Sequence, residues 1–344
     1  MSIKDALAWK PWTVLANRRS VNRHSVESVL LLLLLLLVPL HLNAVEKVTI
    51  AHSVQLSATI APLLYGIHRG FFRDENIDLE YRMLRTDIGV KAIINNEIDY
   101  LYSAGTAIRA SIRGLPIRAL SYDLERLPHF LMGRPGVKSA NDLRGKIIGV
   151  SSFGASGDVA ARACLRSMGI DLKKDVTIVS MGSDAIRYNA IKAGSVEAII
   201  MPLPRNILLK KEGFAELCYA GGIFKGAVSG VVATTDRIRN KPDQARAVLR
   251  GMLKTSRSLK KDRGDFVDFL VSRVKLERDV AEETATVLID GQTKNGIIEE
   301  NDLQAVIDAE RQLMQFDKPV KVSDVADYSL VRDILSKEDK TSTR

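Results

Sequence analysis

Cysteine and histidine are both scarce in this chain of 344 residues. It contains two cysteines, Cys164 and Cys218, and five histidines. Two thiols cannot build a disulfide framework or a cysteine-rich metal site, and the histidines show none of the spacings typical of metal ligands. The sequence therefore predicts neither a metal site nor a cofactor. Because both cysteines lie in apolar surroundings, we expect two buried free thiols, with a single disulfide as the alternative.

The chain also lacks a basic patch interleaved with aromatic residues. Its formal net charge is +9, of which residues 1–44 contribute +3, so the rest of the chain carries only +6. Basic and acidic side chains alternate there, and we expect the densest basic run, residues 254–263, to form a solvated helix face. A nucleic-acid partner is therefore not expected.

No catalytic motif is apparent either. The dinucleotide-binding pattern G-x-G-x-x-G is absent, because residues 152–157 read SFGASG and lack its spacing. No Ser-His-Asp arrangement and no pair of carboxylates suggests a reaction. The sequence therefore favours a binding protein over an enzyme.

The first 44 residues have the layout of a secretory signal peptide. Leu30 to Leu37 is an unbroken run of eight leucines, preceded by basic residues, and the small residue Ala44 stands just before Val45. About 12 apolar residues span roughly 18 Å as a helix, which is short of the ~30 Å hydrocarbon core. We expect cleavage after Ala44 and a periplasmic mature chain, with an uncleaved membrane anchor as the alternative.

Strand and helix patterns alternate along the remaining chain. The strands are expected at residues 47–51, 77–83, 98–102, 117–122, 145–150, 176–179, 198–201, 217–220 and 228–234, with helices between most of them. Such alternation predicts α/β architecture, with mainly parallel sheets covered by helices. Residues 129–134 look like an extended connector, after which the pattern restarts, and residues 241–335 look almost entirely helical.

This layout predicts two α/β domains joined by two crossing strands. The first comprises residues 45–130 and 228–344, and the second comprises residues 131–227. Ligands of open α/β sheets bind beyond the carboxyl ends of the strands, so we expect a cleft between the domains that closes by hinge motion. The stretch GKIIGVSSFGASGD, residues 145–158, opens the second domain as strand, loop and helix start. Its N–H groups and helix dipole favour an anion, although a plain turn is the alternative.

Three stretches resemble segments of solute-binding proteins from the ABC importers that serve nitrate, sulfonate, taurine and thiamine precursors. They are residues 66–72 (GIHRGFF), residues 143–150 (LRGKIIGV) and residues 182–198, and together the resemblance extends over about residues 46–315. Glu197 stands where this family usually has Asp. The resemblance implies the two-domain periplasmic-binding-protein fold of type II. It also implies an ABC permease as partner and a monomeric protein.

The resemblance also implies which loops contact the solute, because the family uses the loops after the first and third strands and the first loop of domain two. In this chain these loops supply Ser53, Gln55, Leu56, Gly105, Thr106, Ser152, Phe153, Ser156 and Gly157. Another strand end adds Met201, Pro202 and Arg205 to the candidates.

Several of these candidates also have an ordinary structural interpretation. Thr106 fits a helix N-cap, and Gly105 fits a turn. Phe153 fits a core anchor as well as a stacking partner. Arg205 and Arg187 fit exposed surface positions better than ligand contacts.

The sequence thus predicts an extracytoplasmic protein that captures a small organic anion and delivers it to an ABC permease. The alternatives are a ligand-sensing domain for a membrane receptor, or an enzyme of the thiamine-pyrimidine-synthase-like fold. The enzymes of that fold use a cysteine-rich motif that this chain lacks. The identity of the solute stays open.

Overall fold

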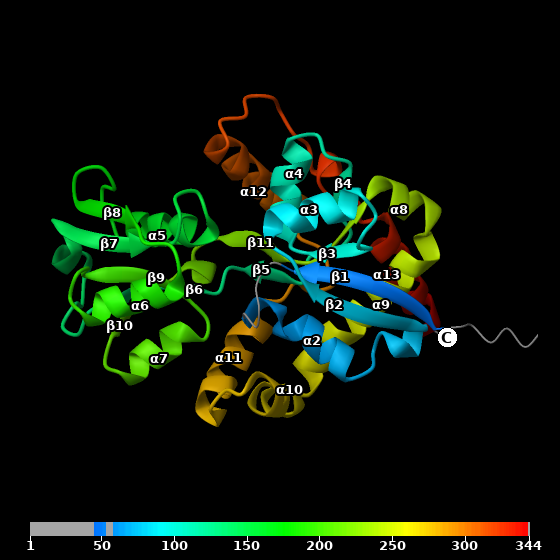
Figure 1. The fold of residues 1–344 in the computed structure, drawn as a ribbon, viewed down its shortest axis with the longest axis horizontal. Helices are drawn as coiled ribbons and strands as arrows, with labels where there is room; N and C mark the ends of the chain where they lie inside the picture. The colour runs from blue at the N-terminus through cyan, green and yellow to red at the C-terminus, as the bar shows by residue number, and fades with distance from the viewer. Residues whose placement is uncertain (1–44, 53–57, 343–344) are drawn as a thin grey trace, which may run out of the picture. The chain divides into compact units, whose positions relative to one another are not determined.

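The first five-stranded sheet joins strands from both ends of the chain. The computed structural model describes residues 45–52 and 58–342. The strand order in this sheet is β2-β1-β3-β12-β4 (Figure 1). The strands are β1 (Glu46–His52), β2 (Ile77–Met83), β3 (Tyr100–Tyr102), β4 (Ile117–Ala119) and β12 (Val231–Thr234). β12 pairs antiparallel with β3 and β4, whereas β1 pairs in parallel with β2 and β3. Four strands therefore run the same way and β12 runs against them.

The second sheet repeats this plan with residues from the middle of the chain. Its order is β10-β6-β9-β7-β8. The strands are β6 (His129–Gly133), β7 (Lys146–Val150), β8 (Val176–Ser180), β9 (Ala198–Pro202) and β10 (Ala215–Tyr219). β6 is antiparallel to β9 and β10, while β7 is parallel to β8 and β9. Both sheets are mixed because each contains one reversed strand, and that strand continues a chain segment that crosses between the sheets.

Helices cover both faces of each sheet, as the alternating sequence pattern predicts. In the first sheet α2 (Ala61–His68) lies on one face, and α3 (Thr86–Ile94) and α4 (Ala104–Ile112) lie on the other (Figure 1). In the second sheet α5 (Ser156–Ser167) lies opposite α6 (Asp184–Lys192) and α7 (Arg205–Lys211). Right-handed crossovers cause this placement. When the chain moves one way along the sheet, its helix covers one face, and when it moves the other way, its helix covers the opposite face.

The two crossing segments meet in a small two-stranded sheet. β5 (Leu124–Arg126) pairs antiparallel with β11 (Lys225–Ser229). Just before β5, the Asp123 N–H donates to the Ser229 carbonyl at 2.8 Å. The apolar pattern predicts one extended strand at residues 228–234. In the structure Gly230 divides this stretch into the end of β11 and the whole of β12.

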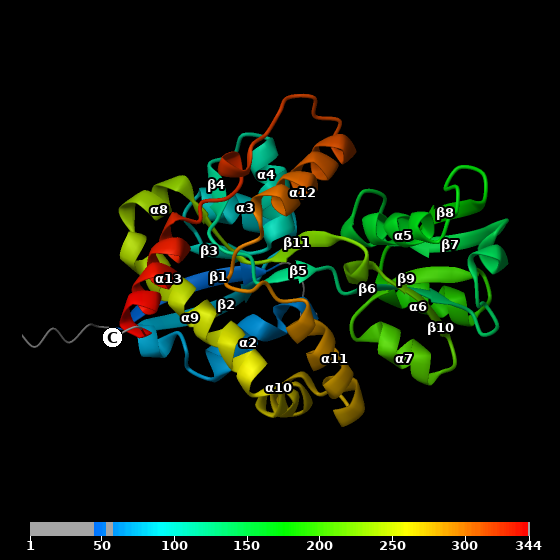
Figure 2. The same ribbon diagram turned by 180° about the vertical axis from the view of Figure 1, so that it is seen from behind.

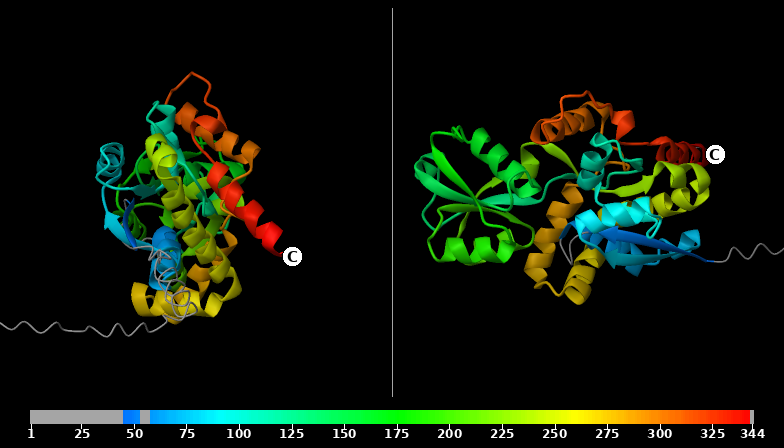
Figure 3. Two further views of the ribbon diagram at one scale, coloured as in Figure 1. Left: turned by 90° about the vertical axis from the view of Figure 1, so that its right-hand side faces the viewer. Right: turned by 45° about the horizontal axis from the view of Figure 1, so that its top comes forward.

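The C-terminal part is mostly helical, as expected. Its helices are α8 (Thr235–Asn240), α9 (Pro242–Lys261), α10 (Arg263–Phe269), α11 (Arg278–Asp290), α12 (Glu300–Leu313) and α13 (Ser329–Ser342). The buried residues Ala245, Val248, Leu249 and Met252 give α9 one apolar face at helical spacing. α9 packs against α2 in the first sheet's core and also lies beside α13 (Figures 2 and 3).

Residues 129–134 are a central strand instead of a connector. β6 hydrogen-bonds to a neighbour on each side, and Phe130, Leu131 and Met132 are all buried. Consecutive apolar residues are typical of a strand with both faces covered, and this pattern resembles a short linker when it is read without its partners.

The two cysteines form a disulfide, which corrects the expectation of free thiols. Cys164 of α5 is bonded to Cys218 of β10, with their Cα atoms 5.8 Å apart. β10 has a register irregularity between Glu216 and Cys218. A bulge of this kind changes the direction of a side chain, and here Cys218 faces the helix that covers the sheet. The contact depends on tertiary packing, so local sequence could not reveal it.

The leader residues 1–44 lie outside the described part of the chain, so the structure does not test the predicted signal peptide. Within the described residues, no helix has both the length and the apolar character needed to span a membrane.

Candidate functional site

Two aromatic side chains end neighbouring strands of the first sheet. His52 is the last residue of β1, and Tyr102 is the last residue of β3. The strands are adjacent in parallel register, and the two ring centroids lie 6.1 Å apart. Both side chains are buried at the carboxyl edge of the sheet, which is the edge where open α/β sheets bind ligands.

Three buried polar side chains at this edge each have an oxygen atom without a partner by strict hydrogen-bond geometry. They are Tyr102, Asp123 just before β5, and Ser229 at the end of β11. In the described part of the chain, the Tyr102 hydroxyl, the Asp123 Oδ2 atom and the Ser229 hydroxyl have no hydrogen-bond partner. Burying a polar atom without a partner costs about 1–3 kcal/mol, so a group of three such atoms is unusual.

These three side chains nevertheless influence one another electrostatically. Burial raises the pKa of the Asp123 carboxyl to about 7, and the Tyr102 hydroxyl opposes this rise. Burial also raises the pKa of Tyr102, the charge of Asp123 raises it further, and Ser229 opposes the increase. The three side chains therefore face one another at the carboxyl edge of the first sheet.

The α4 start supplies two of the predicted residues, Gly105 and Thr106. The helix begins at Ala104, so Thr106 lies inside its first turn and is not its N-cap. The Ser103 hydroxyl donates to the Thr106 hydroxyl at 2.9 Å. A β carbon on Gly105 would lie 3.3 Å from the Ala227 carbonyl oxygen, so this glycine allows α4 to approach β11 closely.

The Gly/Ser loop after β7 places its polar groups at the carboxyl edge of the second sheet. Ser152, Phe153 and Ser156 are exposed, and Gly157 is the second residue of α5. Phe153 is 59% exposed, which rules out a role as a core anchor. The Arg162 guanidinium lies 6.0 Å from the centroid of its ring.

The loop is held by one aspartate in the first turn of α5. Asp158 accepts a hydrogen bond from the Gly154 N–H at 2.9 Å and pairs with Arg162 at 2.7 Å. Gly154 has a φ of 76°, a left-handed conformation that favours glycine. Asp158 therefore occupies part of the positive end of the helix, and Ser152 and Ser156 are exposed beside it.

The end of β9 holds the other predicted residues. Met201 is fully buried in the apolar core, and Pro202 is the last residue of the strand, opposite His129 of β6. Arg205 begins α7 with a side chain 45% exposed, and its Nε lies 3.9 Å from Asp184. The exposed position of Arg205 agrees with the surface interpretation.

Arg187 is buried, which corrects the expectation of a surface arginine. Its side chain is only 2% exposed. Nε donates to the Ile200 carbonyl at 2.9 Å, and the other guanidinium nitrogens donate to the Gly182 carbonyl and to Asp184. Burial lowers the pKa of Arg187, and the charge of Asp184 opposes this effect. These hydrogen bonds connect α6 to the end of β9, so Arg187 has a structural role in the interior of the protein.

Further buried polar groups without partners lie near these elements. Within the residues described, His129 Nδ1, the Ser151 hydroxyl and both amide atoms of Asn206 lack a hydrogen bond. Burial lowers the pKa of His129 to about 4, so its imidazole is neutral at neutral pH. Ser151 ends β7, and Asn206 lies in the first turn of α7.

Ser53, Gln55 and Leu56 lie outside the described residues. Their predicted contacts with a ligand therefore stay predictions.

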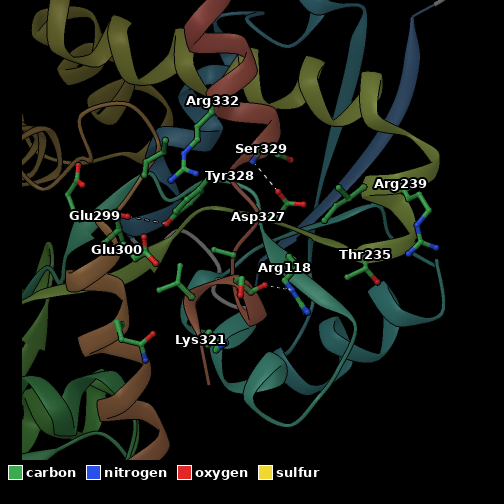
Figure 4. Close-up of a pocket in the computed structure, with 17 residues that line it drawn as sticks. Arg118, Thr235, Arg239, Glu299, Glu300, Lys321, Asp327, Tyr328, Ser329 and Arg332 are labelled. Carbon is green, nitrogen blue, oxygen red and sulfur yellow. Dashed lines mark hydrogen bonds between the residues drawn. The ribbon is translucent and has the colours of Figure 1, made fainter. Parts of the chain in front are cut away.

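A separate pocket of about 910 Å³ lies at the β4 side of the first sheet (Figure 4). It is lined by α8, the start of α12, residues 321–323 and the start of α13. Arg118 donates to the Ser323 carbonyl at 3.2 Å, and Tyr328 donates to the Ile298 carbonyl at 3.4 Å. Basic and acidic side chains both line it, and none of the predicted site residues does.

No group of three or more His, Cys, Asp and Glu side chains suited to a metal ion occurs in the described ranges.

These features agree with a family assignment. The model of the family described as NMT1/THI5 like matches residues 57–262. The chain belongs to this family. No curated protein sequence matches it.

Solved structures identify the fold of this family member. The periplasmic aliphatic sulphonate binding protein SsuA from Escherichia coli superposes with a TM-score of 0.67 at 16% identity, covering 83% of this chain and 99% of that one. The alkanesulfonate-binding protein SsuA from Xanthomonas axonopodis pv. citri bound to MOPS gives 0.62 at 16%, covering 80% and 96%. The desulfurization enzyme DSZB gives 0.62 at 13%, covering 85% and 99%. The chain therefore has the type II periplasmic-binding-protein fold expected from the sequence.

Sequence reasoning missed five polar residues of this region. They are Tyr102, Asp123, His129, Asn206 and Ser229. Four of them lie within a few residues of an expected strand end, and His129 begins the stretch that was interpreted as a connector. A polar residue in an apolar setting is the signal that could have identified them. Their burial was not predictable, because it depends on how the crossing segments pack.

Proposed function

We propose that this protein is an extracytoplasmic solute-binding protein that captures a small organic anion and delivers it to an ABC permease. The observation that carries the proposal is the set of buried polar atoms without partners at the carboxyl edges of both sheets. Tyr102, Asp123 and Ser229 supply them on the first sheet, and Ser151 and Asn206 supply them on the second. A solute held between the sheets would provide the missing hydrogen bonds.

The second sheet supports an anionic group on the solute. The exposed hydroxyls of Ser152 and Ser156 lie at the start of α5, where free N–H groups and the helix dipole favour negative charge. Two proteins of similar fold are described as sulfonate binders, one of them bound to MOPS, and we extend that ligand class to this chain as part of the proposal.

Export and closure complete the proposal. Residues 1–44 act as a signal peptide, and the Cys164–Cys218 disulfide suits the oxidising periplasm. Residues 45–130 with 228–344 and residues 131–227 form two domains that close by bending at β5 and β11. The mature protein works as a monomer. Ser53, Gln55, Leu56, Gly105, Thr106, Phe153, Gly157, Met201, Pro202 and Arg205 belong to the proposed cleft.

Native mass spectrometry of protein purified from its host tests this function. We expect a small organic ion to co-purify and a panel of small sulfonates and carboxylates to include compounds that raise the Tm. Phe153→Ala should weaken binding with an unchanged Tm of the free protein, because Phe153 is exposed. Leu313→Ala, at an exposed position of α12, is the matched control. The absence of any bound solute and of any Tm increase, together with recovery in the cytoplasmic fraction, would refute the proposal.

A further inference from the structure

The pocket of about 910 Å³ in Figure 4 lies at the opposite edge of the first sheet from the candidate solute site. Thr235, which lines it, directly follows β12, the strand that runs against its neighbours. Its N–H donates at 2.9 Å to the carbonyl of Pro116, just before β4. The pocket is therefore at the amino edge of the parallel strands, whereas His52 and Tyr102 end theirs at the carboxyl edge. Its volume is typical of small-molecule sites, so an occupant would be a second ligand, separate from the solute.

Three basic side chains of this pocket have no carboxylate partner in the described part of the chain. They are Arg118 of β4, Lys321, and Arg332 of α13. The Arg118 guanidinium donates to two uncharged groups, the Ile117 carbonyl at 2.8 Å and the Ser323 carbonyl at 3.2 Å. The Arg332 guanidinium lies 5.6 Å from the centroid of the Tyr328 ring. These contacts orient both guanidinium groups and leave their charges without a partner.

The acidic side chains of the pocket have structural roles at helix ends. Asp327 accepts the Ser329 N–H at 3.0 Å, where α13 begins. Glu299 is the N-cap residue of α12 and Glu300 is its first residue, and negative charge stabilises this end of a helix. Arg332 is the fourth residue of α13, where a positive charge has the opposite effect, so helix stability does not explain it. The basic groups can therefore attract an anion from outside the chain.

These basic groups lie at two separate places. In Figure 4 Arg332 lies above Tyr328, whereas Arg118 and Lys321 lie below it. Apolar side chains also line the pocket, namely Ile238, Ile297, Ile298, Val322 and Ala326. A single inorganic anion could reach only one of the two basic places. A molecule with an anionic group at each end of a carbon skeleton could reach both, and carboxylate and phosphate groups both suit a guanidinium.

We propose that this pocket binds an organic molecule with two anionic groups. One group binds at Arg118 and Lys321, the other binds at Arg332, and the carbon skeleton contacts the apolar side chains. This inference does not depend on the proposed transport function, because the two sites lie at opposite edges of the sheet.

Calorimetric titration of the purified protein tests this inference with two dianions and their single-anion counterparts. Adipate is compared with hexanoate, and 3-phosphoglycerate is compared with glycerate. The variants are Lys321→Gln and Arg332→Gln, and both positions are exposed, so each variant should fold like the wild type. Arg166→Gln, at an exposed position in the last turn of α5, is the matched control for the loss of one positive charge. Backbone hydrogen exchange with each ligand shows which segments it protects.

We expect at least one dianion to bind and its single-anion counterpart to bind at least tenfold more weakly. Each pocket variant should weaken the dianion at least fivefold, because it removes a charge-assisted hydrogen bond, and Arg166→Gln should leave the affinity unchanged. Protection should appear at residues 297–300 and 321–332.

Four results would each overturn the inference. They are the absence of binding by both dianions, equal binding of a dianion and its single-anion counterpart, unchanged affinity in both pocket variants, and protection confined to residues 151–157. The last result would place the dianion at the candidate solute site. None of the four would refute the proposed function, which is tested separately by the solute that co-purifies.

Discussion

A β carbon on Gly230 would lie 2.0 Å from the carbonyl oxygen of Ser121, and 2.8 Å from the Cα atom of Tyr122. The two segments that cross between the sheets therefore touch backbone to backbone at this residue. Both atoms belong to the main chain, so no side-chain rotation can relieve the contact.

Gly230→Ala should therefore destabilise the protein by about 3 kcal/mol, because the crossing segments must separate. Gly226→Ala is the control in β11, where the nearest atom to an added β carbon is the Phe224 ring at 3.7 Å. Chemical denaturation of both variants measures the difference. Equal stability of the two would contradict the close backbone contact.

Removal of the Cys164–Cys218 disulfide should lower the free energy of unfolding by about 2–4 kcal/mol, because the bond closes a loop with a sequence separation of 54. Urea denaturation of Cys164→Ala/Cys218→Ala against the wild type measures this loss. A reductant should destabilise the wild type and leave the double variant unchanged. If wild type that has been unfolded and refolded in the presence of reductant has the same free energy of unfolding as the untreated protein, the disulfide does not contribute to stability.

Arg187→Met should destabilise the protein by about 2–4 kcal/mol, since it leaves the Ile200 and Gly182 carbonyls without a donor. Arg205→Met is the matched control, because Arg205 also approaches Asp184 but is 45% exposed, so its loss should cost less than about 1 kcal/mol. Thermal and urea unfolding of the pair compares them. Similar losses would argue against the buried hydrogen bonds of Arg187.

Asp123 should make the solute-free protein less stable as the pH rises from about 4 to about 7. Its pKa is about 7 in the folded state, above the ordinary value of 3.8, so the unfolded chain releases the proton first. The penalty is complete above pH 7 and is on the order of a few kcal/mol. Asp123→Asn should remove this pH-dependent part, and Asp243→Asn, at an exposed position of α9, should retain it. If the free energies of unfolding of Asp123→Asn and wild type depend on pH in the same way between pH 4 and pH 8, the prediction is wrong.

His129 should have the opposite effect on the acid side. Burial lowers its pKa to about 4, below the ordinary value of 6.5, so the unfolded chain binds the proton first as the pH falls. Stability should therefore decrease between about pH 6.5 and pH 4. His129→Gln should reduce this loss, whereas His68→Gln at an exposed position of α2 should not. Urea midpoints measured at several pH values decide between the two outcomes.

Much of the fold could be predicted from local patterns. The strand predicted at residues 77–83 is β2 (Ile77–Met83), and the strand predicted at residues 176–179 is β8 (Val176–Ser180). These elements have clear apolar periodicity, which local sequence contains in full. The loop at residues 151–157 was also placed correctly between a strand and a helix.

The candidate site was predictable only in part. Strand ends that carry Ser and Gly identify the edge of a sheet, so Ser152 and Ser156 could be proposed from the sequence. Asp123 could not, because nothing near it in the sequence distinguishes a buried carboxyl from one in an exposed turn. Its environment is created by Tyr102 and Ser229, which lie far away along the chain.

The sequence by itself determined the succession of strands and helices, the two α/β units and the family, because these depend on residue spacing within short segments. Only the tertiary structure decided that Cys164 meets Cys218, that Arg187 is buried, and that three unbonded oxygens gather where the crossing segments touch. The physical reason is that burial and partnership are properties of contacts between distant segments. Those contacts depend on how the sheets pack and on the close backbone approach of the two crossing segments at Gly230.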